Sequence, residues 1–121
     1  MIKHSILIVD DEAKLLKSLS LLLRDKFDIV TASNGKEGYE QFKNNPYLSI
    51  ILLDLNMPVM NGVEMLKKVR SESKYTNILI MTGSSDHDWA CKCADMKVQG
   101  YLKKPFDIEV LNEKINDILG L

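Results

Sequence analysis

Residues 48–58 read LSIILLDLNMP, and this stretch decides the fold. An almost unbroken aliphatic run ends in a carboxylate, Asp54, and a proline follows four positions later. Continuous apolar runs of this length are typical of strands that are buried on both faces of a sheet. A charge beside such a strand is costly unless a partner compensates it. Asp54 is therefore either an ordinary turn residue at the strand end or part of a site that requires a carboxylate.

Strand-like and helix-like patterns alternate on both sides of this stretch. Short aliphatic runs predict strands, and apolar residues three or four apart predict helices between them. The predicted strands span 5–9, 27–32, 48–53, 77–81 and 100–102. The predicted helices lie within 12–26, over 35–43, after the loop 57–62, over 86–96 and after Pro105. In the first helix we expect one buried face made of Leu15, Leu16, Leu19, Leu22 and Leu23.

This alternation predicts the fold class. Strands that alternate with helices imply right-handed crossovers and a parallel sheet with helices on both faces. We therefore expect an α/β fold with a doubly wound, five-stranded parallel sheet in the order 2-1-3-4-5 and five helices. The chain shows no linker and no low-complexity segment, so residues 1–121 are expected to form one domain.

Composition excludes several classes of protein. The 16 basic and 17 acidic residues nearly cancel, so no bulk charge favours nucleic acid or an anionic membrane. The apolar run near the N-terminus is too short for a signal peptide, and no run reaches membrane-spanning length. Only one residue separates Cys91 from Cys93, which disfavours a disulfide between them. These observations favour a cytoplasmic protein.

Four of the five predicted strands end in residues that could form a site, whereas the second ends in Thr31 and Ser33, with no charge. Asp10 and Asp11 follow the first strand, and Asp54 follows the third. Thr82 ends the fourth strand, and Lys103 and Lys104 follow the fifth. Ligands of open α/β sheets bind at the carboxyl ends of the strands. Each residue alone is common in loops, but their gathering at one edge indicates a site.

The residue types at this edge predict magnesium and phosphoryl chemistry. Close carboxylates repel one another, and a hard divalent cation relieves that repulsion. A site of oxygen ligands without histidine or cysteine suits Mg²⁺, which accepts phosphate oxygens as its remaining ligands. Lys104 and the Thr82 hydroxyl can bind the outer oxygens of a phosphoryl group. Asp54 is central and is the candidate nucleophile, because an aspartate can form an acyl phosphate.

Four motifs now identify a resemblance that spans essentially the whole chain. They are VDDE (9–12), LLDLNMPVMNG (52–62), MTG (81–83) and YLKKPF (101–106). In this order and spacing they resemble the receiver domain of two-component response regulators, the CheY-like family. The resemblance implies a flavodoxin-like fold and a switch that is controlled by phosphorylation. It also implies that the chain assists its own phosphorylation and dephosphorylation, without acting on an outside substrate.

The resemblance assigns a role to each residue that would handle the phosphoryl group. Asp54 would accept it from a phosphohistidine on a sensor histidine kinase or a phosphotransfer protein. Thr82 and Lys104 would bind its oxygens. Tyr101 would be the aromatic residue that changes rotamer on activation. The peptide before Pro105 would be cis, which only a following proline makes plausible.

The resemblance also implies a set of magnesium ligands. Asp11 and Asp54 would bind Mg²⁺ directly, together with the backbone carbonyl of Asn56. Asp10 would hold a water molecule that is bound to the metal. Each of these residues stands where the family motif has it.

The expected output is a change of surface. Phosphorylation would remodel the fourth helix, the fifth strand and the fifth helix, and would so signal to an output domain or a partner protein. We expect no direct binding to nucleic acid or membrane, and either a monomer or a phosphorylation-dependent dimer. The chain departs from the family at Gly83, where alanine is common, and at Lys97, where glycine is usual. Trp89 could anchor a partner, and His87, Cys91 and Cys93 are expected to be ordinary helix residues.

Two other functions fit the composition. A magnesium-dependent phosphohydrolase with an aspartyl nucleophile would place its paired acids, nucleophile included, after the first strand and would carry a cap for its substrate. Here the central acid lies on the third strand, and no insertion could form a cap. A flavin-binding protein would need a phosphate-binding loop after the first strand, but DDEAK (10–14) is acidic there.

Overall fold

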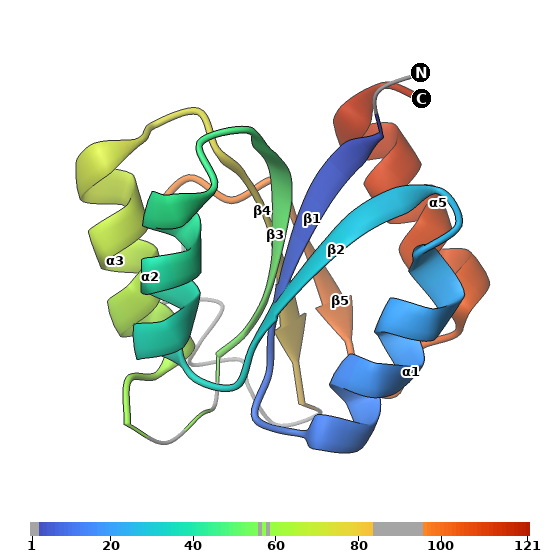
Figure 1. Ribbon diagram of the computed structural model, residues 1–121, viewed down its shortest axis with the longest axis horizontal. Coiled ribbons are helices and arrows are strands. Elements are labelled where there is room, and N and C mark those ends of the chain that lie inside the picture. Colours follow the sequence, from blue (N-terminus) through green and yellow to red (C-terminus); the bar gives the residue numbers. More distant parts are fainter. Residues whose placement is uncertain (1–2, 56, 58, 84–95) are drawn as a thin grey trace.

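The computed structural model describes residues 3–55, 57, 59–83 and 96–121. In these residues five strands alternate with four helices (Figure 1). The strands are β1 (His4–Val9), β2 (Phe27–Ala32), β3 (Leu48–Asp54), β4 (Asn77–Thr82) and β5 (Gly100–Lys103). The helices are α1 (Ala13–Leu23), α2 (Gly35–Asn44), α3 (Gly62–Glu72) and α5 (Ile108–Leu119). The helix predicted over 86–96 falls almost entirely on 84–95, outside the described residues.

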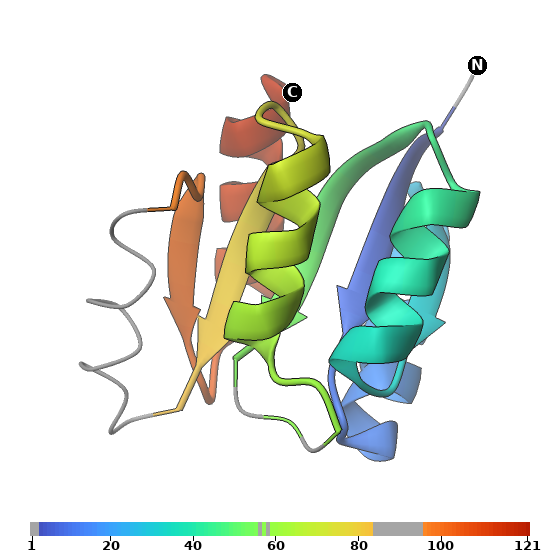
Figure 2. The same cartoon turned by 90° about the vertical axis from the view of Figure 1, so that its left-hand side faces the viewer.

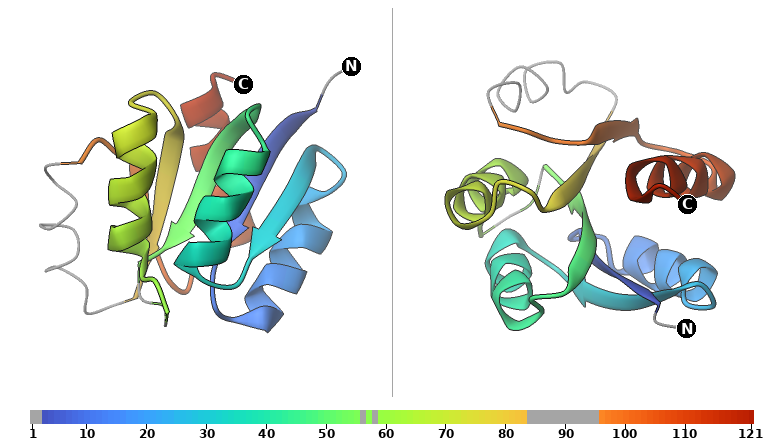
Figure 3. Two further views of the ribbon diagram at one scale, coloured as in Figure 1. Left: turned by 60° about the vertical axis from the view of Figure 1, so that its left-hand side comes forward. Right: turned by 90° about the horizontal axis from the view of Figure 1, so that it is seen from above.

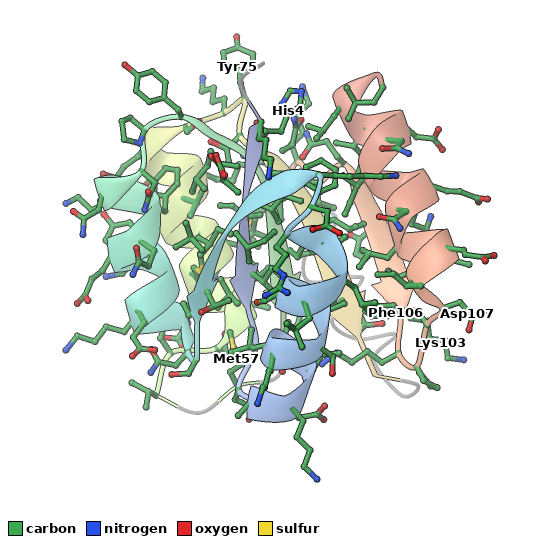
Figure 4. The ribbon with its side chains drawn as sticks, turned by 45° about the vertical axis from the view of Figure 1, so that its right-hand side comes forward. His4, Met57, Tyr75, Lys103, Phe106 and Asp107 are labelled. Carbon is green, nitrogen blue, oxygen red and sulfur yellow. The ribbon has the colours of Figure 1, made fainter. Side chains whose placement is uncertain are left out.

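The strands form one parallel sheet in the order β2-β1-β3-β4-β5, as the sequence predicts. Val9 lies opposite Leu53, Asp54 opposite Met81, and Thr82 opposite Lys103. The carboxyl ends of these strands therefore reach the same level. Figure 4 shows Met57 and Lys103 at this end of the sheet, and His4 and Tyr75 at the other. No helix in the described part of the chain is long and apolar enough to span a membrane.

Helices cover both faces of the sheet (Figures 2 and 3). On one face, Ile51 and Leu53 of β3 belong to a buried cluster with residues of α3. On the other face, Ile50 and Leu52 belong to a cluster with residues of α1 and α5. Successive side chains of a strand point to opposite faces, so the part of a strand that is covered on both sides is apolar at successive positions. This explains why LSIILL does not alternate between apolar and polar residues.

The predicted buried face of α1 is correct except at one residue. Leu19 and Leu23 are buried, and Leu15 and Leu16 pack partly against the same cluster. Leu22, however, is 57% exposed, so its predicted burial is wrong. The buried face is centred between Leu19 and Leu23, and Leu22 lies toward its edge, where the helix turns away from the sheet.

Two local features of the backbone follow, and the second confirms an expectation from the resemblance. Gly38 brings α2 close to the sheet, because a Cβ atom there would lie 2.9 Å from Val9 Cγ2 and 2.7 Å from Met65 Sδ. The Lys104–Pro105 peptide is cis.

Gly62 holds the start of α3 directly against the end of β3. Its amide donates a hydrogen bond to the Leu55 carbonyl at 3.0 Å. A Cβ atom on Gly62 would lie 2.3 Å from the Asp54 carbonyl oxygen and 2.6 Å from Leu55 Cα. Only glycine permits this approach of two backbones.

We expect Gly62→Ala to lower the free energy of unfolding by about 2 kcal/mol, because the added methyl group would overlap backbone atoms that cannot rotate away. Gly100→Ala is the matched control. Its Cβ atom would meet the end of a side chain, Leu79 Cδ1, at 3.2 Å, so we expect a smaller loss. Urea unfolding followed by circular dichroism measures both variants. Equal losses of stability in the two variants would show that the backbone contact at Gly62 is no tighter than the side-chain contact at Gly100.

Candidate functional site

Three carboxylates meet at the carboxyl end of the sheet. Asp10 and Asp11 follow β1, and Asp54 is the last residue of β3, the strand next to β1. Each offers an oxygen atom, and these atoms all lie within 4.8 Å of one another. Asp10 is fully buried, Asp54 is 5% exposed and Asp11 is exposed. The parallel register of β1 and β3 produces this cluster from residues more than forty positions apart.

Lys104 reaches the cluster from the loop after β5. Its Nζ donates a hydrogen bond to Asp10 Oδ2 at 2.6 Å and lies 3.6 Å from Asp54 Oδ2. The backbone amide of Lys104 donates to the Thr82 carbonyl at 2.6 Å, which extends the pairing of β4 and β5 by one residue. The lysine is thus fixed by its backbone and shared by two carboxylates.

Both oxygens of the Asp10 carboxylate have partners within the chain. Oδ2 accepts from Lys104, and Oδ1 accepts from the backbone amide of Glu12 at 2.9 Å. These partners offset much of the cost of burying this charge completely. Asp10 is therefore already satisfied by hydrogen bonds, which distinguishes it from the exposed Asp11.

The surroundings of Lys104 raise the pKa of its ammonium group. Burial acts the other way and would lower the pKa, but the hydrogen bond with Asp10 and the charges of Asp54, Asp10 and Glu12 outweigh it. A raised pKa means that the charged lysine stabilises the folded chain at every pH below the ordinary value of 10.5. This stabilisation is lost only as the pH rises through the folded-state pKa, so the ion pair is intact at neutral pH.

Thr82 and Tyr101 face the same side of the sheet. Tyr101 lies opposite Ile80, which points into the cluster on the side of α3. Thr82 follows Ile80 by two residues, so its side chain points to that same side. Tyr101 is 37% exposed, and Thr82 is partly buried. A change at Thr82 therefore occurs on the face of the sheet that carries Tyr101.

Two hydrogen bonds hold the residues directly before α3. The Gly35 amide, at the start of α2, donates to the Met60 carbonyl at 2.9 Å. Asn61 caps α3, because its Oδ1 accepts from the backbone amide of Glu64 at 3.0 Å. Together with the bond from the Gly62 amide to Leu55, these bonds hold Leu55 and residues 60–62.

A pocket of about 450 Å³ opens beside Lys104. It is lined by Glu12, Leu15, Gly83, Lys104, Pro105 and Phe106. Its walls come from the start of α1 and from the loops after β4 and β5, and Figure 4 labels Phe106 at this end of the molecule. A group that enters the site from solvent can approach the lysine here.

The donor set fits a magnesium ion. Three carboxylates and one ammonium group leave a net charge of −2 at the cluster, which a divalent cation neutralises. All the candidate ligand atoms are oxygens, the donors that Mg²⁺ prefers. A cation held here would leave Asp54 beside Lys104, whose ammonium group could stabilise negative charge on a phosphoryl group.

The structure brings together Asp10, Asp11, Asp54 and Lys104 and places Thr82 next to Lys104 through its carbonyl. Other positions singled out in the sequence lie outside the described residues. These are Asn56, His87, Trp89, Cys91 and Cys93.

Sequence reasoning missed one member of the site. Glu12 supplies the amide that binds Asp10, and its charge helps to raise the pKa of Lys104. Glu12 belongs to the VDDE motif, but the sequence does not show which backbone amide will bind a carboxylate.

Comparisons with known proteins identify the family and the fold. The family model described as "Response regulator receiver domain" matches residues 6–116. A curated relative, the chemotaxis protein CheY homolog of Campylobacter jejuni, is 35% identical over 95% of this chain and 92% of its own length.

Solved structures of high similarity come from several bacteria. CheY4 of Vibrio cholerae has a TM-score of 0.90 and 30% identity, and the match covers 98% of this chain and all of that one. A chain of the CheX–CheY–BeF3–Mg²⁺ complex of Borrelia burgdorferi has a TM-score of 0.88 and 25% identity, over 97% of this chain and 90% of that one.

Proposed function

The chain belongs to the response regulator receiver family of two-component signalling, and from this premise we propose that Asp54 is its phosphoacceptor. Members of this family are signalling switches controlled by phosphorylation, and so is this chain. The observation that carries the assignment is the position of Asp54. Its side chain is almost fully buried, and one of its oxygens lies within 4.8 Å of oxygens of two other carboxylates. Its Oδ2 lies 3.6 Å from Lys104 Nζ. We further propose that residues 1–121 form one receiver domain.

Asp11 and Asp54 would hold Mg²⁺ directly, and the Asn56 carbonyl would be a third ligand. Asp10 would act through a water molecule, as the resemblance implies, while its two oxygens accept from Lys104 and from the Glu12 amide. The bound ion would neutralise the acidic cluster and the charge on a transferring phosphoryl group. A structural neighbour from Borrelia burgdorferi was solved in a complex with BeF3 and Mg²⁺, which supports a role for Mg²⁺ here.

Asp54 would perform the chemical step. One of its carboxylate oxygens attacks the phosphorus of a phosphohistidine on a histidine kinase or phosphotransfer protein. The new P–O bond forms as the P–N bond breaks, and the electron pair of that bond returns to the imidazole. Lys104 binds a phosphoryl oxygen, and the Thr82 hydroxyl donates to another.

The switch would follow from competition for Lys104. In the structure Lys104 is hydrogen-bonded to Asp10, and a phosphoryl group on Asp54 draws it the other way. Thr82 turns toward the phosphoryl group, and Tyr101 moves into the space on the shared face of the sheet. The new surface, which includes β5 and α5, is then read by an output domain or a downstream protein.

The phosphohydrolase alternative is not favoured. Such an enzyme would release phosphate repeatedly from small substrates, whereas a receiver gains one phosphoryl group and loses it slowly. Incubation with Mg²⁺ and acetyl phosphate, followed by intact-mass spectrometry, separates the two. We expect one added phosphoryl group per chain, and none when EDTA is present. Continuous phosphate release without an adduct would favour the hydrolase.

We expect Asp11→Asn to weaken Mg²⁺ binding at least about tenfold, because it removes one of the proposed charged ligands. Asp28→Asn is the matched control, since Asp28 is an exposed carboxylate on β2 outside the cluster. Isothermal titration calorimetry with MgCl₂ measures both variants. If Asp11→Asn binds Mg²⁺ as wild type does, the ion is not held where we place it.

A further inference from the structure

Helices α1 and α5 lie side by side on one face of the sheet (Figures 1 and 3). Leu19 and Leu23 of α1 share one buried cluster with Leu111 and Ile115 of α5. Helix α1 follows β1 and α5 follows β5, and these two strands are parallel, so the two helices run in the same direction. Their outer faces together form one surface, which we call the α1–α5 face.

The α1 side of this face is positive. Lys14, Lys17 and Arg24 are all exposed, and no acidic residue lies between positions 13 and 24. The α5 side is negative. Its exposed charged residues are Glu109, Glu113 and Asp117, and its one basic residue, Lys114, is half-buried.

Both ion pairs in the described part of the chain involve Lys104, so none of these six exposed charged side chains forms one there. The positive and negative sides of the face are therefore both available to a partner.

Exposed apolar residues gather at one end of the face. Leu21 and Leu22 lie in the last turn of α1 and are 49% and 57% exposed. Leu121 follows the last turn of α5 and is 65% exposed. Because the helices run in the same direction, these residues lie at the same end of the face. Half of the eight large apolar side chains exposed in the described chain belong to α1, α5 or the residues after α5.

We propose that the α1–α5 face binds a second copy of this chain about a two-fold axis parallel to the helices. Such an axis places α1 of one copy on α5 of the other, twice. Each contact then joins the positive α1 of one copy to the negative α5 of the other, with the two helices parallel. The exposed leucines at the ends of the two faces then lie at the same level. A face that carries both complementary patches suits an isologous dimer, whereas a uniformly acidic or basic partner would match only one helix.

Charge-reversal variants test the pairing. Lys17→Glu and Glu113→Lys each place like charges at both contacts of a dimer. Within the described residues, the side chain of neither residue makes a hydrogen bond or an ion pair. We expect each variant alone to dimerise at least about tenfold more weakly than wild type. An equimolar mixture of the two variants restores association, because both contacts of the mixed dimer then join opposite charges. Sedimentation equilibrium measures all three samples.

Two further samples separate this proposal from the phosphorylation mechanism. Asp54→Asn should self-associate as wild type does, since the α1–α5 face does not include the acidic cluster. Raising the NaCl concentration should weaken the wild-type dimer, because salt screens exposed charges. A wild-type chain that stays monomeric at low salt and high concentration would overturn the proposal. So would variants that dimerise as well alone as in the mixture.

Discussion

Replacement of Asp54 by asparagine is expected to abolish phosphorylation by acetyl phosphate, with a rate loss of at least about 10³-fold. The amide has no anionic oxygen to attack phosphorus, and its neighbours cannot take over. Asp10 is fully buried, and Lys104 and the Glu12 amide already bind its oxygens. Asp11 is exposed and would be a metal ligand rather than a nucleophile. Intact-mass spectrometry after incubation with Mg²⁺ and the phosphodonor measures the effect.

Asp28→Asn serves as the control for this experiment as well. It removes an exposed carboxylate from β2 and should gain a phosphoryl group at the wild-type rate. Circular dichroism should show that both variants keep the fold, because the exchange at position 54 preserves size and removes one charge from a crowded cluster. An undiminished adduct on Asp54→Asn would place the acceptor elsewhere.

Lys104→Met is expected to lower the free energy of unfolding by about 3 kcal/mol, because it leaves the buried Asp10 carboxylate without its cation. Asp10 is fully buried, and its Oδ2 accepts a 2.6 Å hydrogen bond from Lys104. Methionine keeps the apolar stem of the side chain, so the loss reports mainly on charge. Saturating Mg²⁺ should restore part of the lost stability, since a divalent cation also neutralises the cluster.

Lys103→Met is the control for this change. Lys103 is the adjacent residue in the chain and is exposed, so its replacement should alter stability by no more than about 0.5 kcal/mol. Urea unfolding at neutral pH, with and without MgCl₂, measures both variants. Equal stability of Lys104→Met and Lys103→Met would mean that Lys104 does not compensate the charge of Asp10.

The sheet could be predicted from the sequence because each strand carries its own signal. Residues 50–53, directly before Asp54, are all apolar, as expected for the part of a strand that is covered on both faces. In a parallel sheet, residues that follow the strands meet at one edge, so the sequence alone predicts that Asp54 lies near Asp10. The helix predicted over 86–96 stays a prediction.

Contacts that depend on tertiary packing could not be predicted in the same way. The hydrogen bond between Lys104 and Asp10 joins residues 94 positions apart, and only the folded structure shows which carboxylate takes the lysine. The exposure of Leu22 does not follow from the sequence, because leucines occupy a wide part of the circumference of α1. Periodicity alone does not show which of them the sheet covers. Five leucines suggested one broad buried face, but the sheet covers a narrower one.

The position of the phosphoryl group tests the central claim most directly. After reaction with acetyl phosphate and Mg²⁺, borohydride reduction converts an acyl phosphate into an alcohol, which marks the acceptor as homoserine. Trypsin then releases residues 44–67, in which Asp54 is the single aspartate, and residues 4–14, which contain Asp10 and Asp11. We predict homoserine at position 54 of the first peptide. Homoserine in the second peptide, or in neither, would contradict the assignment of Asp54 as the phosphoacceptor.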